Sequence, residues 1–224
     1  MTFLLQKISC VFGCILKIRN VLYKYKLITT HKFDVPIVSI GNICSGGSGK
    51  TPFVLWLSNI LCQKYSVCVI SRGYNRPTKE TIIVKGYEEK YDVNMIGDEP
   101  LMLIKQNKKL NMVIGNNKVR SIKAAIKKLD IDIILLDDGF QSQYIYRDLD
   151  VVMFNESIKK SLLQLLPLGI LREPINSLNR SDFIVSTRNK TKQIKSILKK
   201  YNKRICCANE TFSIVNEKHE IVNI

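Results

Sequence analysis

Hydrophobic and polar positions along the chain alternate between short apolar runs and longer stretches with helical spacing. Runs rich in β-branched residues indicate buried strands at 35–40, 67–73, 110–115, 131–136, 149–154 and 183–186. Between them, apolar residues recur at helical spacing after residue 50, over 101–104 and over 117–129. Strands that alternate with helices predict an α/β fold, with a mostly parallel sheet covered by helices on both faces.

The first segment, residues 1–33, has helical spacing and no acidic residue. Its apolar positions recur every three or four residues, and Lys and Arg side chains are spread along it. The longest apolar run, 8–16, is too short to cross a bilayer, and no cleavage site of a secretory signal follows it. We expect an amphipathic helix that lies in a membrane interface; a helix packed on the domain core is the alternative.

Composition narrows the class of protein. The chain has 224 residues, of which 46% are hydrophobic, which suits one large domain, or one domain with a small appendage. Seven cysteines without paired spacing, and only two histidines, argue against a disulfide framework, a zinc site and a multi-histidine metal site, and favour a reducing compartment. We expect the membrane-interface helix at 1–33, the main domain at 34–190 and the start of an incomplete C-terminal subdomain at 191–224.

The formal net charge of +16 indicates a polyanionic partner or reflects a composition rich in Lys, Ile and Asn. A nucleic acid, an anionic membrane and a phosphorylated substrate are the candidate partners. Aromatic and basic residues are not interleaved and no nucleic-acid-binding module is present, so we expect no nucleic-acid partner.

A glycine-rich loop follows the first predicted strand and precedes a helical pattern, which is the order that a P-loop requires. Glycines let the backbone N–H groups face phosphate oxygens, and the helix N-terminus adds its positive end. Lys50 is expected to reach the β- and γ-phosphates, and the Thr51 hydroxyl to bind Mg²⁺. The predicted nucleotide-binding residues are Ser45, Gly46, Gly47, Ser48, Gly49, Lys50 and Thr51. The usual pattern begins with Gly where this chain has Cys44, and an ordinary Gly/Ser loop is the alternative.

Acidic residues follow two other patterns. The apolar run 131–136 ends at Asp137 and Asp138, an arrangement in which one carboxylate holds Mg²⁺ beside a P-loop, although a solvated turn has the same composition. Asp98 opens the apolar-periodic stretch 101–104, where spacing alone favours a helix N-cap over a general base.

Together these motifs resemble the tetraacyldisaccharide 4′-kinases, the lipid A 4′-kinases of Gram-negative bacteria. The matching motifs occur in the family's order at 36–42, 46–52, 71–74, 97–100, 137–141, 147–150 and 171–174. The resemblance covers roughly residues 20–190 and implies transfer of the γ-phosphate of ATP to the 4′-hydroxyl of an acylated disaccharide 1-phosphate. It also implies a peripheral enzyme on the cytoplasmic face of the inner membrane, with an anionic lipid surface as partner. We expect a monomer.

The resemblance also implies residue roles. Asp98 matches the family's proposed base, and Lys50 is its catalytic lysine. Thr51, Glu99, Asp137, Asp138 and Gln141 match positions near the metal and the phosphates. Arg72, Arg172 and Glu173 are expected to face the substrate.

Two departures bear on activity. Ser142 stands where the family has a histidine, and relatives are longer, with a C-terminal histidine that pairs with the catalytic aspartate. His219 lies in a polar stretch and is not given that role. We therefore expect this chain to bind nucleotide but to be a poor kinase alone. The alternatives are a truncated nucleotide-binding remnant and a partition-type or carrier-type ATPase with a deviant P-loop. Ser45 stands where such ATPases carry a signature lysine, which argues against the last.

Overall fold

The computed structural model describes residues 2–73, 76, 80–188, 196–198, 200–201, 204–208, 214–215 and 221–222. Tyr74 and His219, which the sequence analysis names, lie outside these residues, as does much of the predicted subdomain at 191–224.

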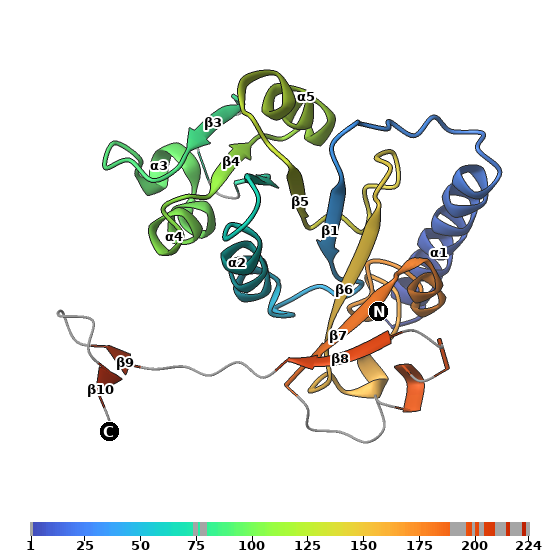
Figure 1. Cartoon of the computed structure of the whole chain (residues 1–224). Helices are drawn as coiled ribbons and strands as arrows, with labels where there is room; N and C mark the ends of the chain where they lie inside the picture. The colour runs from blue at the N-terminus through green and yellow to red at the C-terminus, as the bar shows by residue number, and fades with distance from the viewer. Residues whose placement is uncertain are drawn as a thin grey trace.

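One eight-stranded sheet organises the chain, in the order β3-β4-β2-β5-β1-β6-β7-β8 (Figure 1). Every neighbouring pair is parallel except β3, which is antiparallel to β4. The strands are β1 Ile37–Gly41, β2 Val67–Ser71, β3 Ile82–Lys85, β4 Asn111–Ile114, β5 Ile133–Asp137, β6 Leu149–Asn155, β7 Phe183–Thr187 and β8 Arg204–Ala208. A separate antiparallel pair joins β9 Ile214–Val215 and β10 Ile221–Val222.

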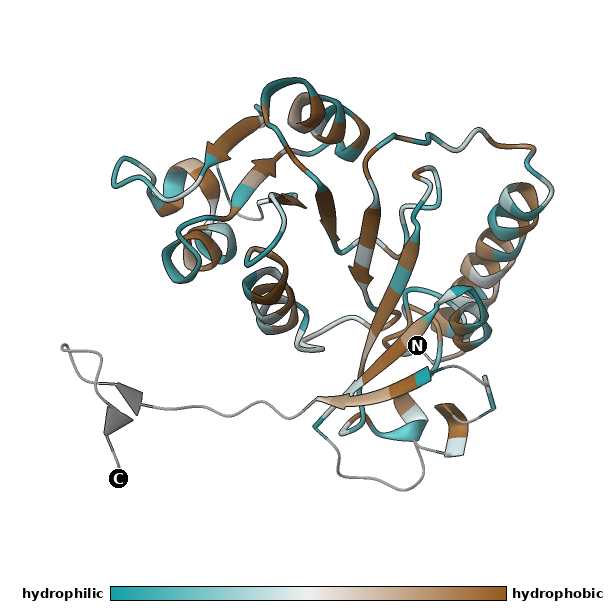
Figure 2. Ribbon diagram, viewed as in Figure 1, coloured by the Kyte–Doolittle hydropathy of each residue, from teal (hydrophilic) through white to brown (hydrophobic). Residues whose placement is uncertain are grey.

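The mostly parallel α/β prediction is confirmed, and all six predicted strands are present. The strands could be predicted because the central ones are nearly continuous apolar runs (Figure 2). Such runs are typical of strands that are buried on both faces of a sheet. The sequence analysis missed β3, a short edge strand, and β8. Because β8 pairs with β7, the predicted domain boundary near residue 190 falls between two strands of one sheet.

Helices cover the sheet on both faces. The α-helices are α1 Thr2–Lys24, α2 Lys50–Leu61, α3 Val93–Ile96, α4 Asp98–Gln106 and α5 Lys118–Lys128, and the 3-10 helices are η1 Lys160–Leu162 and η2 Ile175–Arg180. Along β2, Val69 packs with α2 and α4, while its neighbours Cys68 and Ile70 pack with α5. The two-residue alternation of a strand therefore places α2 and α4 on the face opposite α5.

The N-terminal helix α1 contacts the domain along one narrow edge. Ser9 and Leu16 are buried there, and the Ser9 hydroxyl donates to the carbonyl oxygen of Leu165 at 2.9 Å. A row of apolar side chains points away from the domain and is 46–69% exposed: Phe3, Leu4, Ile8, Val11, Ile15 and Ile18. The edge of the helix that faces the protein is thus mixed in polarity, with Ser9 and Leu16 buried, while the apolar row remains open. None of the helices described has the length and apolar character that a membrane crossing requires.

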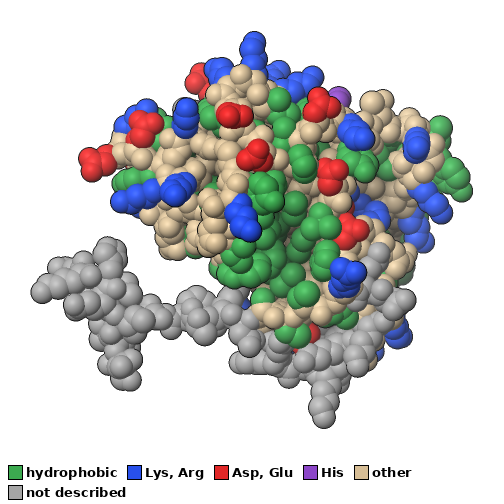
Figure 3. Space-filling view, in the orientation of Figure 1, with side chains coloured by type: hydrophobic (Ala, Val, Ile, Leu, Met, Phe, Trp, Pro, Cys, Tyr) green, Lys and Arg blue, Asp and Glu red, His purple; other side chains and the backbone are tan. Residues whose placement is uncertain are grey.

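An apolar cavity of about 720 Å³ lies between α2 and the adjacent face of β6, β7 and β8. Phe53 and Trp56 of α2 line it on one side, and Met153 and Phe183 line it from the sheet. Figure 3 shows hydrophobic side chains gathered over this part of the surface. Among the described residues, this face of β6, β7 and β8 is therefore not fully covered by other side chains.

Candidate nucleotide-binding site

The loop between β1 and α2 is held from behind by side chains at the carboxyl ends of neighbouring strands. Asn155 of β6 donates from Nδ2 to the carbonyl oxygen of Gly47 at 3.2 Å, and the Thr187 hydroxyl of β7 donates to that of Ser48 at 3.3 Å. Asn42 donates from Nδ2 to the Ser48 hydroxyl at 3.0 Å. These contacts fix the loop ahead of the N-terminus of α2, which carries the positive end of the helix dipole.

Two glycines give the loop its turn. Gly46 has φ of 104° and Gly49, the N-cap of α2, has φ of 78°. These positive φ values are unfavourable for residues that carry a Cβ. Ser45 departs from the prediction in one respect. Its backbone N–H donates to the carbonyl oxygen of Ile170 at 2.7 Å, so this amide is engaged inside the protein and is not free for a phosphate.

The adjacent carboxylates of Asp137 and Asp138 meet different partners. Asp137 ends β5, next to β1, and its carboxylate accepts from the Ser71 hydroxyl at 3.1 Å. Burial raises the pKa of Asp137, and the charge of Asp138 raises it further. Asp138 has both carboxylate oxygens 3.0 Å from the Arg172 guanidinium and lies 3.7 Å from Lys50 Nζ. Burial would raise the pKa of Asp138, but Arg172 and then Lys50 lower it overall.

Lys118 lies beneath this acidic turn, although the sequence indicated only a lysine on an amphipathic helix. Its side chain is 1% exposed, and its ammonium donates to the backbone oxygens of Asp137 at 2.8 Å and Asp138 at 2.5 Å. Asp138 has φ of 48°, so the ammonium holds a turn that is strained for a residue with a side chain. Burial lowers the pKa of Lys118 to about 8, against the opposing effect of the two aspartates.

The start of α4 brings two more acids to the same edge. Gly97, not Asp98, is the N-cap of α4, so the N-cap interpretation of Asp98 is wrong. The exposed Asp98 carboxylate accepts only from the neighbouring Glu99 N–H, at 2.9 Å, among the hydrogen bonds of the described residues. Burial raises the pKa of Glu99, as do Asp137 and Asp98, whereas Lys50 and the Thr51 hydroxyl oppose this rise. The pKa of Glu99 therefore responds to residues of both the P-loop and β5.

Two further predicted residues border the site. Arg72 is exposed directly after β2, and its charge helps to lower the pKa of Lys118. Gln141 donates from Nε2 to the backbone oxygen of Asn42 at 2.7 Å. The Oε1 of Gln141 is buried and has no hydrogen-bond partner among the described residues.

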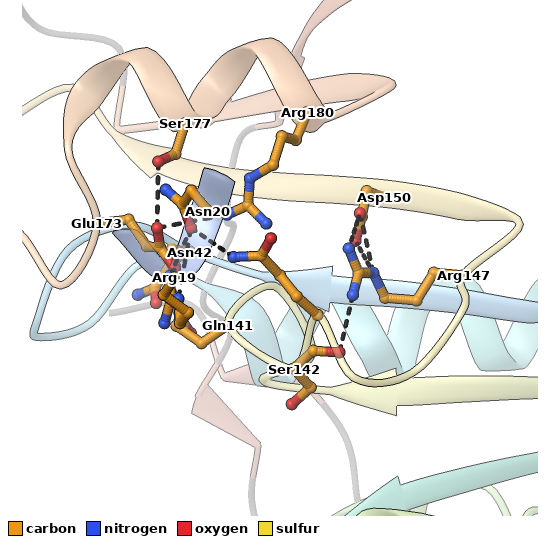
Figure 4. A network of polar contacts seen from close by, with 11 residues as sticks. Arg19, Asn20, Asn42, Gln141, Ser142, Arg147, Asp150, Glu173, Ser177 and Arg180 are labelled. Atoms are coloured by element: carbon orange, nitrogen blue, oxygen red, sulfur yellow. Dashed lines mark hydrogen bonds and ion pairs between the residues drawn. The ribbon is translucent and has the colours of Figure 1, made fainter. Parts of the chain in front are cut away.

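Glu173 differs from the prediction that it faces a substrate. It is fully buried, and its carboxylate contacts Arg19 of α1, Arg180 at 3.4 Å and the Ser177 hydroxyl at 3.1 Å (Figure 4). Its acidic group is therefore committed to basic and hydroxyl partners inside the protein. In this structure the Glu173 carboxylate is therefore not exposed to a substrate.

The residues just before Glu173 run beside the P-loop. The Arg172 N–H donates to the carbonyl oxygen of Ile43 at 2.7 Å, and Cys44 forms a β-bridge with Leu171. Burial raises the pKa of the Cys44 thiol to about 12, so the thiol is neutral and packs as an apolar side chain. This explains how Cys44 replaces the usual glycine, since the position is a buried rung beside segment 170–173.

A phosphate-binding loop between the central strand and a helix, beside a strand that ends in acids, defines a P-loop NTPase-like protein. The model of the tetraacyldisaccharide-1-P 4′-kinase family matches residues 1–221, and the chain belongs to this family.

Individual relatives agree with this assignment. The tetraacyldisaccharide 4′-kinase of Aquifex aeolicus is 34% identical over 213 residues, covering 92% of this chain and 67% of the relative. That of Halothermothrix orenii is 32% identical and covers 95% of this chain and 58% of the relative. The crystal structure of LpxK from Aquifex aeolicus in complex with ATP has a TM-score of 0.79 at 32% identity, covering 97% of this chain and 68% of that one. The chain thus spans about half to two thirds of the length of the relatives it matches.

Several site residues escaped the sequence analysis. Asn155 and Thr187 stand at the ends of predicted strands, and their polar character at a carboxyl edge was a usable signal. Lys118 and Arg19 gave no such signal, because each looks like one more basic residue on an amphipathic helix.

Proposed function

We propose that this chain binds Mg·ATP and transfers the γ-phosphate to the 4′-hydroxyl of a tetraacyldisaccharide 1-phosphate. The observation that carries the proposal is Lys50, which begins α2 at the P-loop and faces Asp138 across 3.7 Å in a member of this kinase family. The similar Aquifex aeolicus protein was crystallised with ATP, which supports the choice of nucleotide.

Nucleotide phosphates would be held by charge and dipole. The N-terminus of α2 attracts an anion, and the Lys50 ammonium is a mobile cation beside it. The Lys50 ammonium lies 3.7 Å from Asp138, which keeps this cation close to the loop where the phosphates would bind. Phosphoryl transfer asks little covalent chemistry of the protein, so holding both reactants in line is its main task.

The oxygen donors near the P-loop suit Mg²⁺. Thr51, Glu99 and Asp137 supply a hydroxyl and two carboxylates, and Gln141 has a buried amide oxygen without a partner among the described residues. Asp138 is already neutralised by Arg172 and Lys50, so we assign the metal to Asp137. No group of three acidic, histidine or cysteine side chains among the described residues is close enough to hold an ion unaided. Mg²⁺ would neutralise charge on the phosphates, which with water would complete its shell.

The acceptor hydroxyl would lie near the start of α4. Asp98 is exposed there and its carboxylate makes no ion pair among the described residues, so it can accept a proton from a sugar hydroxyl. Arg72, exposed after β2, supplies a cation for the phosphate groups at this edge. These assignments follow the family roles that the sequence motifs imply.

We further propose that α1 binds the lipid surface from which the substrate is taken, on the cytoplasmic face where ATP is available. The support is the row of exposed apolar residues on the side of α1 that faces away from the domain. Lysines such as Lys7 and Lys17 flank this row and would contact anionic lipid headgroups.

Transfer of radiolabelled phosphate from ATP to the disaccharide tests the proposal. The assay has two arms, this chain alone and this chain with the C-terminal region of the Aquifex aeolicus relative added. Turnover in either arm, lost in Lys50→Met and kept in the exposed control Lys64→Met, is the expected result. Nucleotide binding without transfer in both arms would contradict the proposed reaction.

A further inference from the structure

The helix α1 contacts the domain through residues that lie directly behind the P-loop. Arg19 forms an ion pair with buried Glu173, and Asn20 accepts at Oδ1 from Gln143 Nε2 at 2.7 Å. Figure 4 shows Arg19 and Asn20 of α1 beside Glu173, with Gln141 close by. Ser9, about three helical turns earlier, donates to the carbonyl oxygen of Leu165, which forms a β-bridge with Leu171.

Glu173 and Gln143, the partners of Arg19 and Asn20, are each close in sequence to a residue that contacts Asn42, which directly follows β1. Glu173 follows Arg172, whose Nη1 donates to Asn42 Oδ1 at 3.4 Å. Gln143 follows two residues after Gln141, whose Nε2 donates to the Asn42 backbone oxygen at 2.7 Å. Asn42 in turn donates to the Ser48 hydroxyl inside the loop. Two short chains of contacts therefore join α1 to both ends of the phosphate-binding loop.

The Glu173 branch also reaches the acidic side of the site. Arg172 makes the two 3.0 Å contacts with Asp138, which in turn lies beside Lys50. A shift of α1 would therefore be transmitted to the loop through Asn42 and to Lys50 through Asp138. This branch holds five charged side chains that are buried or partly buried, and such groups tolerate displacement poorly because each charge left unpaired is costly.

We infer that Arg19 and Asn20 are positioning residues for the P-loop, through which docking of α1 on an anionic lipid surface tightens nucleotide binding. The inference rests on the proposed nucleotide and membrane binding and adds their coupling. When α1 is docked, lipid contacts its outer side and the domain contacts its inner edge, so the helix and its partners are more ordered. The loop then loses less conformational entropy when nucleotide binds. By linkage, nucleotide must raise the affinity for the lipid surface by the same factor.

The dissociation constant of Mg·ATP is measured by calorimetry with and without vesicles of phosphatidylglycerol and phosphatidylethanolamine. We expect vesicles to lower it by about fivefold or more in the wild-type chain. In Arg19→Gln the dissociation constants with and without vesicles should be nearly equal. Arg19→Lys should restore part of the difference between them. Lys123→Gln is the control, since it removes one charge from an exposed position of α5, outside both α1 and the phosphate-binding loop, and should keep the wild-type ratio of these constants. Asn20→Leu breaks the second contact while leaving the ion pair of Arg19 in place.

Co-sedimentation with the same vesicles, with and without Mg·ATP, gives the reciprocal measurement. Arg19→Gln should lose its response to nucleotide, whereas Lys123→Gln should keep both its vesicle affinity and that response. Nucleotide binding that ignores vesicles in the wild-type chain, or an unchanged ratio in both Arg19→Gln and Asn20→Leu, overturns the coupling and leaves the proposed function standing. Absence of nucleotide binding in the wild-type chain overturns both.

Discussion

Arg172 and Asp138 form a two-pronged ion pair in which two guanidinium nitrogens each lie 3.0 Å from a carboxylate oxygen. The pair joins the turn after β5 to the segment beside the P-loop, and Lys50 approaches the same carboxylate. Parallel, two-pronged geometry is the strongest arrangement of these groups and orients both of them. The carboxylate of the neighbouring Asp137 takes part in none of the ion pairs of the described residues.

Arg172→Met should destabilise the fold by about 1.5–3 kcal/mol, at the lower end because Arg172 stays partly exposed. Arg172 lowers the pKa of Asp138, so its contribution is present above the unfolded-state value of about 3.9 and is lost as pH falls below it. Urea unfolding at neutral and at acid pH measures this. The difference in the free energy of unfolding between wild type and Arg172→Met should shrink on acidification. Arg172→Lys should retain part of the stability that Arg172→Met loses. A difference that grows in acid would contradict the assignment.

Lys118→Met should change how stability depends on pH on the alkaline side. The pKa of Lys118 is about 8 in the fold and about 10.4 when unfolded, so between these values the unfolded chain binds more protons. Wild-type stability should therefore rise relative to the variant as pH increases from about 8 to 10, by at most about 3 kcal/mol. Unfolding in urea across this range checks the slope. Lys123→Met, at an exposed position of α5, is the control and should leave the slope unchanged.

Glu173→Ala should cost about 3–5 kcal/mol, because Arg19 and Arg180 would then face each other without an acid. Ser177→Ala removes only a hydroxyl donor from the same carboxylate and should cost about 1 kcal/mol. Denaturant unfolding compares the two. Limited proteolysis between α1 and β1 should also be faster in Glu173→Ala alone. Equal effects of the two changes would show that the ion pairs contribute little.

Asp98→Asn should lower phosphate transfer by about 10²–10⁴-fold and leave the affinity for Mg·ATP unchanged. The carboxylate is exposed at the start of α4 and is assigned to the acceptor hydroxyl, not to the nucleotide. Asp92→Asn is the matched control, since Asp92 is an exposed helix cap that accepts from the Met95 N–H at 2.7 Å. Transfer assays and calorimetry separate the two effects. A loss of nucleotide affinity equal to the loss of turnover would remove Asp98 from the role of base.

Replacing Ile8 and Ile15 together by serine should weaken co-sedimentation with anionic vesicles by at least about tenfold, because both lie on the exposed apolar row of α1. Ile126→Ser on α5 removes an exposed apolar side chain elsewhere and should have no effect. High salt should weaken the remaining binding through the lysines of α1. Unchanged sedimentation of the double variant would place the lipid contact elsewhere.

Local patterns in the chain were sufficient for the sheet and for the centre of the site. Each central strand is a continuous apolar run, and the residues of the P-loop are contiguous, so neither depends on knowing which distant segments meet. The sequence alone therefore determined the α/β class, the P-loop with Lys50 and Thr51, and the acidic end of β5.

Only the tertiary structure decided the partners of the charged residues. Glu173 looked like a substrate contact and Lys118 like a surface lysine, yet both are buried, one against Arg19 and the other beneath Asp137. A sequence pattern reports the face of a helix or strand on which a residue lies, but not which distant segment covers that face. Parallel strands bring their carboxyl ends to one edge regardless of their separation along the chain, and there the free energy of a buried charge depends on the partner it meets.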